Sequence, residues 1–234
     1  MTLHAPNSLN TEAARAEWFE HWQRGPTRLR WNALPVQVGD PAPDVDLTDA
    51  RSGSPIRLAS AWSDRPALLL FWRHFGCSCG RDRCARLIGE LEAYRGAGAD
   101  VVLIGQGEPE RATVYAAAND LPPDLTILCD PDERAYRAFG ILEGGPAQML
   151  FDAPDEFLRC EQSAGQSLAA DRLAQGRPMV DNPWLLPAEF VVASNGDVVQ
   201  AHRYQWCEDY PDPRVNIASI RHATGELVPA YARA

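Results

Sequence analysis

Continuous apolar runs mark the strands that this chain is expected to form. Runs of strand length lie at 67–72, within 100–107 and within 124–132. Such runs are typical of strands that are buried on both faces of a sheet. Later in the chain, residues 188–203 contain an Asn195-Gly196 pair, which predicts a β-hairpin that turns at these two residues.

Helical spacing appears between and beyond these runs. From Cys84 to Leu91, apolar residues recur at i, i+3, i+4 and i+7, which places them on one face of a helix. Trp18, Phe19 and Trp22 have similar spacing within 11–24 and predict an amphipathic helix, whose aromatic face packs on this chain or on a second copy. Further helices are expected at 109–120, 133–141 and 213–223.

The order of these elements predicts an α/β domain. A strand–helix–strand–helix–strand series implies parallel strands joined by right-handed crossovers, and the late hairpin adds an antiparallel edge. Residues 142–185 form a long insertion before that hairpin, and connections of this length often serve as a lid or an interface. We expect an N-terminal helix and linker at 1–35, a main domain at 36–222 and a tail at 223–234.

The composition is that of an ordinary soluble globular protein and narrows the range of partners. Hydrophobic residues make up 45% of the 234 positions and charged residues 23%, with a formal charge of −10. That charge argues against nucleic-acid binding, which needs clustered cations. No run approaches the roughly 18 to 20 apolar residues that span a bilayer, and the N-terminus lacks the apolar segment of a secretory signal. We therefore expect a cytoplasmic protein that binds neither nucleic acid nor membrane.

Three of the six cysteines cluster directly behind the first apolar run, at Cys77, Cys79 and Cys84. Cytoplasmic thiols are normally reduced, so such a cluster is more often catalytic or metal-binding than part of a disulfide framework. A turn that enters a helix beside cations lowers the pKa of a thiol, and Gly76 would let the backbone bend there. The neighbouring potential cations are Arg73, His74, Arg81 and Arg83. The pattern predicts an activated thiol at Cys77 or Cys79.

The remaining cysteines have ordinary interpretations. Cys84 falls on the apolar face of its helix and Cys129 near the end of a buried strand, so both are expected in the core. Cys160 lies in the insertion and Cys207 in the loop after the hairpin, where a lone cysteine usually serves packing.

Five segments of the chain follow one another in an informative order. They are "VGDPAPDVDLTD", "LLLFWRHFGCSC", "VVLIGQGEPERATVYAAAND", "TILCDPDERAYRAFGI" and "LPAEFVVASNGDVVQAHR". These segments resemble the thioredoxin fold and, more narrowly, the peroxiredoxin-like members of the alkyl hydroperoxide reductase and thiol-specific antioxidant superfamily. The resemblance implies a thioredoxin-like α/β fold, a mixed sheet flanked by helices, to which the N-terminal helix and the insertion are additions.

Two motifs of the related families are absent. The stretch "RHFGCSC" lacks the Pro and the Thr or Ser of the peroxiredoxin pattern P-x-x-x-T-x-x-C, and C-x-C replaces the C-x-x-C of thioredoxins.

Pro187 stands where thioredoxin-fold proteins keep a cis-proline; the alternative is a trans-proline that opens an edge strand. Arg203 could stabilise an anion at the site, although a solvated arginine is the commoner case.

The resemblance implies a thiol-dependent oxidoreductase. Cys77 matches the first cysteine of the family pattern and would attack a peroxide or a disulfide. Cys79 would resolve the intermediate, and Cys207 and Cys160 are further candidates if the fold brings them close. The implied partners are a small peroxide or disulfide substrate, a thiol reductant (thioredoxin or a small thiol) and a second copy in a homodimer. No cofactor or resident metal is expected.

Two other functions remain open from the sequence. The C-x-C pair, with His74 or Cys84, could bind Cu(I) or Zn(II), although structural zinc needs four ligands and a single His at a strand end is more often a structural residue. The chain could also be a redoxin-fold scaffold that binds a partner without turnover, with the N-terminal helix and the insertion as its binding surface.

Overall fold

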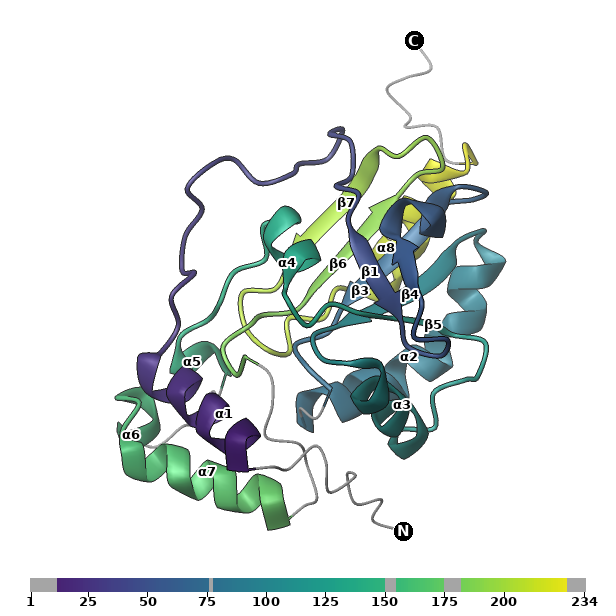
Figure 1. Ribbon diagram of the computed structural model, residues 1–234. Coiled ribbons are helices and arrows are strands. Elements are labelled where there is room, and N and C mark those ends of the chain that lie inside the picture. Colours follow the sequence, from purple (N-terminus) through teal and green to yellow (C-terminus); the bar gives the residue numbers. More distant parts are fainter. Residues whose placement is uncertain (1–11, 76–77, 150–154, 175–181, 227–234) are drawn as a thin grey trace.

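A mixed sheet forms the centre of the molecule within residues 12–75, 78–149, 155–174 and 182–226, which the computed structural model describes (Figure 1). Its strands are β1 (Asp46–Asp49), β2 (Pro55–Arg57), β3 (Ala67–Phe71), β4 (Asp100–Gly105), β5 (Thr126–Cys129), β6 (Ala188–Val192) and β7 (Val198–Arg203). They lie in the order β2-β1-β5-β4-β3-β6-β7. Strands β3, β4 and β5 are parallel, and the strands on either side of them are antiparallel. The predicted α/β sheet is confirmed, with an antiparallel hairpin at each edge.

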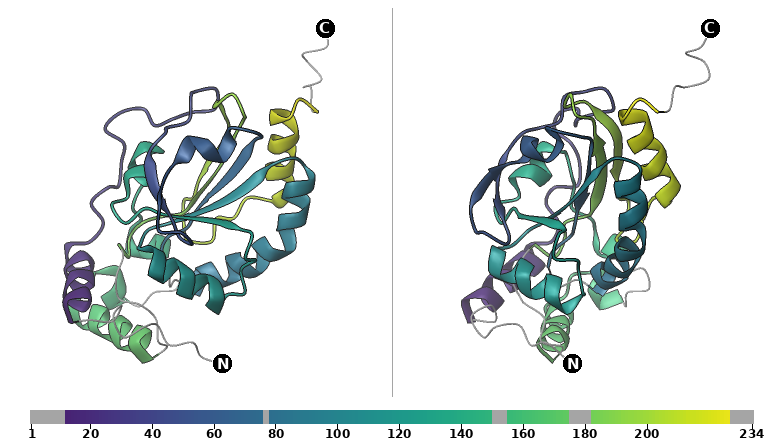
Figure 2. Two further views of the ribbon diagram at one scale, coloured as in Figure 1. Left: turned by 45° about the vertical axis from the view of Figure 1, so that its right-hand side comes forward. Right: turned by 90° about the vertical axis from the view of Figure 1, so that its right-hand side faces the viewer.

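Helices cover both faces of the sheet (Figure 2). One face carries α2 (Ser78–Gly96), α3 (Pro109–Ala118) and α8 (Pro213–Ala223), and the other carries the 3-10 helix η2 (Leu58–Trp62) and α4 (Arg134–Ala138). Successive residues of a strand point to opposite faces. Leu68 and Leu70 of β3 accordingly belong to the core under α2, whereas Leu69 and Phe71 belong to the core under α4. The continuous apolar run of β3 is therefore explained by burial on both sides.

The N-terminal helix and the insertion together build one added unit, which we call the helical cap. It consists of α1 (Glu12–Arg24), α5 (Pro146–Met149), α6 (Asp155–Leu158) and α7 (Gln162–Ala174), which lie side by side at the lower left of Figure 1. Trp18, Trp22 and Trp184 form its aromatic centre. A side chain at Gly165 of α7 would overlap the ring of Trp22, so this glycine permits the close approach of α1. The aromatic residues of α1 pack on their own chain, as one of the two interpretations expected.

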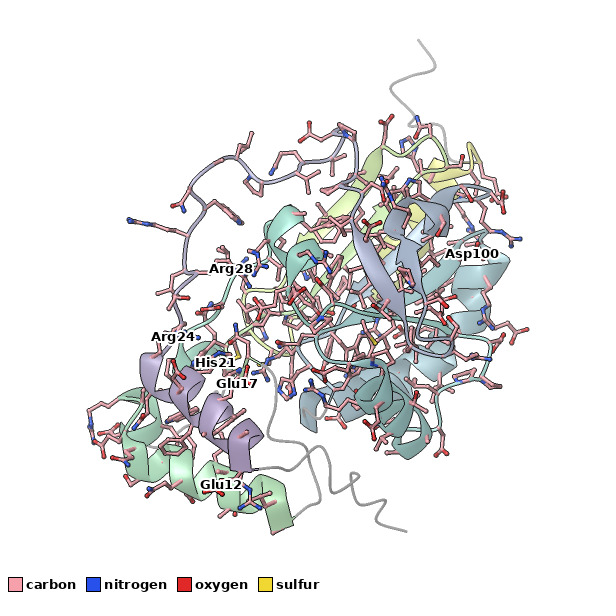
Figure 3. The ribbon with its side chains drawn as sticks, viewed as in Figure 1. Glu12, Glu17, His21, Arg24, Arg28 and Asp100 are labelled. Carbon is pink, nitrogen blue, oxygen red and sulfur yellow. The ribbon has the colours of Figure 1, made fainter. Side chains whose placement is uncertain are left out.

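Buried polar side chains tie the helical cap to the sheet. Glu143 accepts hydrogen bonds from the backbone N–H groups of Thr27 (2.5 Å) and Arg28 (3.1 Å) and from Asn182 Nδ2 (2.7 Å). Asn182 in turn exchanges two 2.9 Å hydrogen bonds with Gln106, which follows β4. Figure 3 shows Arg28 beyond the end of α1, where the chain leaves the helical cap. The N-terminal segment and the end of the insertion are thus joined to the same end of the sheet.

An extended segment, residues 27–45, follows α1 and is called the strap. Its backbone bonds to β7 through Gly39 N–H to Val198 O (2.8 Å) and Val198 N–H to Asp40 O (2.9 Å). Arg203 of β7 donates from Nη2 to Val36 O (2.6 Å), and its guanidinium lies 5.8 Å from the ring of Trp31. The strap therefore covers part of the outer edge of β7, which would otherwise offer unpaired backbone groups.

Candidate active site at the carboxyl end of β3

The cysteine cluster lies where β3 passes into α2. Strand β3 ends at Phe71 and α2 begins at Ser78, so Cys79 belongs to the first turn of the helix. The expected helix N-terminus is confirmed, and its unpaired backbone N–H groups and positive dipole end favour a thiolate. Cys77 and Gly76 lie outside the described residues, as do the side chains of Cys79 and Arg81.

A buried aromatic group supports the chain just before the cysteines. The ring of Phe75 packs 5.5 Å from the ring of Tyr115 and against Gly105 at the end of β4, where a side chain would overlap it. Trp72 Nε1 donates to the Tyr115 hydroxyl (2.7 Å), which lies 3.2 Å from Cys84 Sγ. Burial raises the pKa of Cys84 to about 11. The prediction that Cys84 is a core residue is confirmed.

A small cavity opens beside this group, between the end of β3 and the start of β6. Its volume is about 20 Å³, enough for a water-sized group. The wall is formed by Leu70–Arg73, Arg83, Pro187–Glu189, Tyr204, Cys207 and Tyr210. Residues 72 and 73 belong to the chain that leads directly into the cysteine turn. The cavity therefore brings a second thiol, that of Cys207, to the same end of the sheet.

The two remaining cysteines of the late chain differ in position. Cys207 Sγ lies 3.3 Å from Met149 Sδ, and its backbone N–H donates to Gln148 O (2.9 Å). Burial raises the pKa of Cys207, and the charge of Arg73 opposes that shift. Cys160 packs in the helical cap and is not part of the cavity wall. Of the two lone cysteines proposed as resolving residues, only Cys207 therefore lines the cavity.

Arg73 and His74, the expected cations beside the cysteines, are both buried. Arg73 donates from Nε to Leu185 O (3.0 Å) and from Nη2 to Pro183 O (2.5 Å). Its guanidinium thus holds the end of the insertion in place and keeps a positive charge at the cavity.

Arg83 and Glu189 form a buried ion pair that the sequence analysis did not identify. Glu189 of β6 is only 2% exposed, and its Oε1 accepts from Arg83 Nε (3.1 Å), Arg83 Nη2 (3.0 Å) and the Tyr204 hydroxyl (2.5 Å). Its Oε2 accepts from Asn216 Nδ2 (2.7 Å). Arg83 also donates to Glu90 Oε2 (2.8 Å), so two carboxylates neutralise this cation. One signal was available: a glutamate in the second position of the otherwise apolar strand "AEFVV".

Pro187 lacks the cis bond that the resemblance implied, and Arg203 lies away from the cavity. No cis peptide bond occurs among the described residues, so Pro187 is trans, and it precedes β6, which is an interior strand and not an edge. Arg203 is half-buried and not part of the cavity wall, and its guanidinium donates to Phe139 O (2.8 Å) and to the strap. It packs 5.0 Å from the ring of Phe190, on the face of β6 opposite Glu189.

The described residues offer neither a metal site nor a membrane-spanning helix. Among the side chains that the structure describes, no group of three or more His, Cys, Asp or Glu could hold a metal ion. Within the described ranges, no helix is both long enough and apolar enough to cross a bilayer. A larger hollow, about 480 Å³, lies between α3 and the start of β5, and no cysteine is found in its described wall.

Comparisons with known proteins agree with this architecture. A profile of the AhpC/TSA family matches residues 38–201. The thioredoxin-like protein AAED1, chloroplastic, of Arabidopsis thaliana is 30% identical over 107 residues, which are 46% of this chain and 42% of that protein. The match thus spans less than half the length of that relative.

Solved structures share the fold at low sequence identity. Peroxidoxin BcpB from Mycobacterium tuberculosis has a TM-score of 0.54 at 18% identity, over 80% of this chain and 97% of that one. A peroxiredoxin-like protein from Aquifex aeolicus has a TM-score of 0.56 at 12% identity, over 82% and 90%. The match to the family covers most of the sheet and the cysteine cluster. The chain therefore belongs to the AhpC/TSA family, as a peroxiredoxin-like protein with a thioredoxin fold.

Proposed function

We propose that this protein is a thiol-dependent oxidoreductase in which Cys77 attacks a peroxide or a disulfide. One observation carries the proposal: the cavity at the end of β3 has a second thiol, Cys207, and a buried guanidinium, Arg73, in its wall, directly before the cysteine turn. Membership of the AhpC/TSA family and a fold shared with a peroxidoxin support it.

The acidity of the thiols supports Cys77 or Cys79 as the attacking group. Burial raises the pKa of Cys84, Cys160 and Cys207, so these thiols are protonated near neutral pH. Cys79, by contrast, is in the first turn of α2, and Cys77 immediately precedes that helix. A thiol at a helix N-terminus is more acidic than a free one. The C-terminal cysteines are thus suited to a later step, in which a thiol reacts with an already oxidised sulfur.

The proposed chemistry has two forms. With a peroxide, the Cys77 thiolate attacks one oxygen, the O–O bond breaks, and water or an alcohol leaves with a proton while Cys77 becomes a sulfenic acid. With a disulfide, Cys77 forms a mixed disulfide and releases a thiolate. In both forms a second thiol, Cys79 or Cys207, then forms an intramolecular disulfide, and an external thiol reductant returns two electrons. Thioredoxin or a small thiol in the cytoplasm would serve as that reductant, and a homodimer remains our expectation.

The test is turnover by the full chain. We expect consumption of hydrogen peroxide or an organic hydroperoxide, or reduction of a small disulfide, with dithiothreitol or thioredoxin as reductant. Cys77→Ser should abolish each activity that the wild type shows, and the matched control Cys160→Ser should keep it. Full activity of Cys77→Ser would show that Cys77 is not the nucleophile. A wild-type protein that turns over none of these substrates, with thiols inert to peroxide, would refute the enzyme proposal.

A further inference from the structure

We infer that Glu189 is a positioning residue: it ties the helix that follows the cysteine turn to the loop that carries Cys207, and thereby sets how fast these two segments form a disulfide. The inference rests on the proposed thiol chemistry of Cys77 and names Cys207 as the thiol that resolves it.

Glu189 joins elements that are distant in the sequence. Its carboxylate accepts from Arg83 of α2, from the hydroxyl of Tyr204 after β7, and from Asn216 of α8. Asn216 Oδ1 accepts a further hydrogen bond from Gln200 of β7 (2.7 Å). One side chain on an interior strand therefore fixes a helix, a loop and a second helix.

Burying this charged pair is energetically unfavourable, which indicates a role other than packing. Removing a carboxylate and a guanidinium from water is unfavourable, and apolar residues of similar volume often stabilise a protein core equally well or better. The neighbours of Glu189 in β6 are Ala188 and Phe190, so the strand itself is otherwise apolar. An apolar residue at this position could pack, but it could not hold three donors from three elements in fixed directions.

Two of these contacts, those with Arg83 and Tyr204, involve residues that lie close to cysteines in the sequence. Arg83 is one helical turn beyond Cys79 in α2, so its ion pair fixes the start of that helix against β6. Tyr204 is three residues before Cys207, and its backbone N–H also donates to Pro187 O (3.1 Å). Arg83, Tyr204 and Glu189 all line the cavity that contains Cys207. The two thiol-bearing segments are thus anchored to the same carboxylate.

The step that depends on this anchoring is disulfide formation. The Cys207 sulfur attacks the sulfur of the Cys77 sulfenic acid, an S–S bond forms, the S–O bond breaks, and the hydroxide leaves as water with the Cys207 proton. Reactions between held groups are very sensitive to geometry, and a misplacement of about 1 Å can cost about 100-fold in rate. The first attack on peroxide involves only Cys77 and does not need the loop of Cys207 in place.

The experiment compares three variants of the full chain after one equivalent of hydrogen peroxide. Glu189→Gln removes the charge that holds Arg83, and Tyr204→Phe removes only the hydroxyl that ties the loop. Asp130→Asn is the matched control, because Asp130 is an equally buried carboxylate that accepts from Arg134 N–H and Ala135 N–H, at the start of α4 on the other face of the sheet. Quenched-flow mass spectrometry measures the amounts of sulfenic acid, sulfinic acid and the Cys77–Cys207 disulfide. Each variant is measured at a temperature below its unfolding transition.

We expect Glu189→Gln and Tyr204→Phe to slow disulfide formation about 10- to 100-fold more than they slow sulfenic acid formation. When a second equivalent of hydrogen peroxide is added, more Cys77 should then be oxidised to the sulfinic acid than in the wild type. Asp130→Asn should form the disulfide at the wild-type rate. If Tyr204→Phe and Glu189→Gln both do so as well, Glu189 is not a positioning residue.

Two outcomes in the wild type separate this inference from the proposed function. If peroxide produces only a Cys77–Cys79 disulfide, the role of Glu189 is refuted while the thiol chemistry of Cys77 stands. If Cys77 is not oxidised at all, the proposed function itself fails.

Discussion

Each described cysteine has surroundings that decide its reactivity. Cys84 is held between Tyr115 and the core, and its pKa rises from 9.0 to about 11 because burial disfavours the thiolate. Only the thiolate is alkylated, so Cys84 should be unmodified by iodoacetamide at pH 8 in the folded protein and modified after denaturation in urea. Peptide mass spectrometry measures both states. Rapid modification of Cys84 in the folded chain would contradict its burial.

The same shift gives a pH dependence with a definite sign. A folded-state pKa above the unfolded one means that the unfolded chain loses the Cys84 proton first. This contribution to stability is therefore complete below about pH 9 and is lost as pH rises toward about 11. Replacing Cys84 by Ala should reduce the decline in the unfolding free energy between these two pH values, measured by urea denaturation. If the unfolding free energy of Cys84→Ala declines with pH as steeply as that of the wild type, this pH dependence does not come from Cys84.

Replacing Glu189 should lower the stability of the protein. Breaking a buried pair leaves one partner uncompensated, and such a change typically costs about 3 to 5 kcal/mol. We expect Glu189→Gln to lower the free energy of unfolding by about this amount in urea denaturation. Glu90→Gln should cost less, because the Glu90 side chain is 17% exposed and Arg83 keeps Glu189. A larger loss for Glu90→Gln than for Glu189→Gln would show that Glu90 is the main partner of Arg83.

At the scale of elements, the close packing of β4 against the cysteine turn depends on one glycine. A Cβ at Gly105 would overlap the ring of Phe75, which immediately precedes the undescribed Gly76 and Cys77. Overpacking of this kind costs about 1 to 3 kcal/mol and displaces the side chain that is met. We expect Gly105→Ala to lower the rate of Cys77 oxidation by about tenfold or more, measured by mass spectrometry. Gly89→Ala, at a position with open space on α2, is the control and should leave that rate unchanged.

The sequence predicted the sheet better than it predicted the added unit. Strands β3 and β4 form where the sequence has continuous apolar runs, and α8 has the expected bounds. The spacing of apolar residues predicted these elements because each of them is buried against the sheet or within it. The helices α6 and α7 were not expected, because their buried residues pack against α1, which lies far away in the chain. The ion pair of Glu189 and the contacts of Arg203 were not predicted for the same reason. Their partners Arg83, Tyr204 and Val36 are brought close by the tertiary structure and not by sequence spacing.

At the scale of the whole molecule, the polar ties of Glu143, Asn182 and Gln106 join the helical cap to the sheet. Such ties should make both parts unfold together. We expect urea transitions followed by tryptophan fluorescence, to which Trp18, Trp22 and Trp184 of the helical cap contribute, to coincide with those followed by far-ultraviolet circular dichroism. In Asn182→Ala the fluorescence transition should move to lower urea. Separate transitions in the wild type would show that the helical cap is an independent unit.

The strap also affects the folding of the chain during its synthesis on the ribosome. Arg203 bonds to Val36 across 167 residues, and Trp184 donates to His21 O across 163 residues. During synthesis the N-terminal helix and strap leave the ribosome long before β7 and Trp184 exist, so for most of translation their apolar side chains have no native partner. Contacts of such sequence separation form late and slow folding. A nascent chain stalled before residue 182 should therefore bind chaperones through its first 40 residues, and completion of β7 should end that dependence.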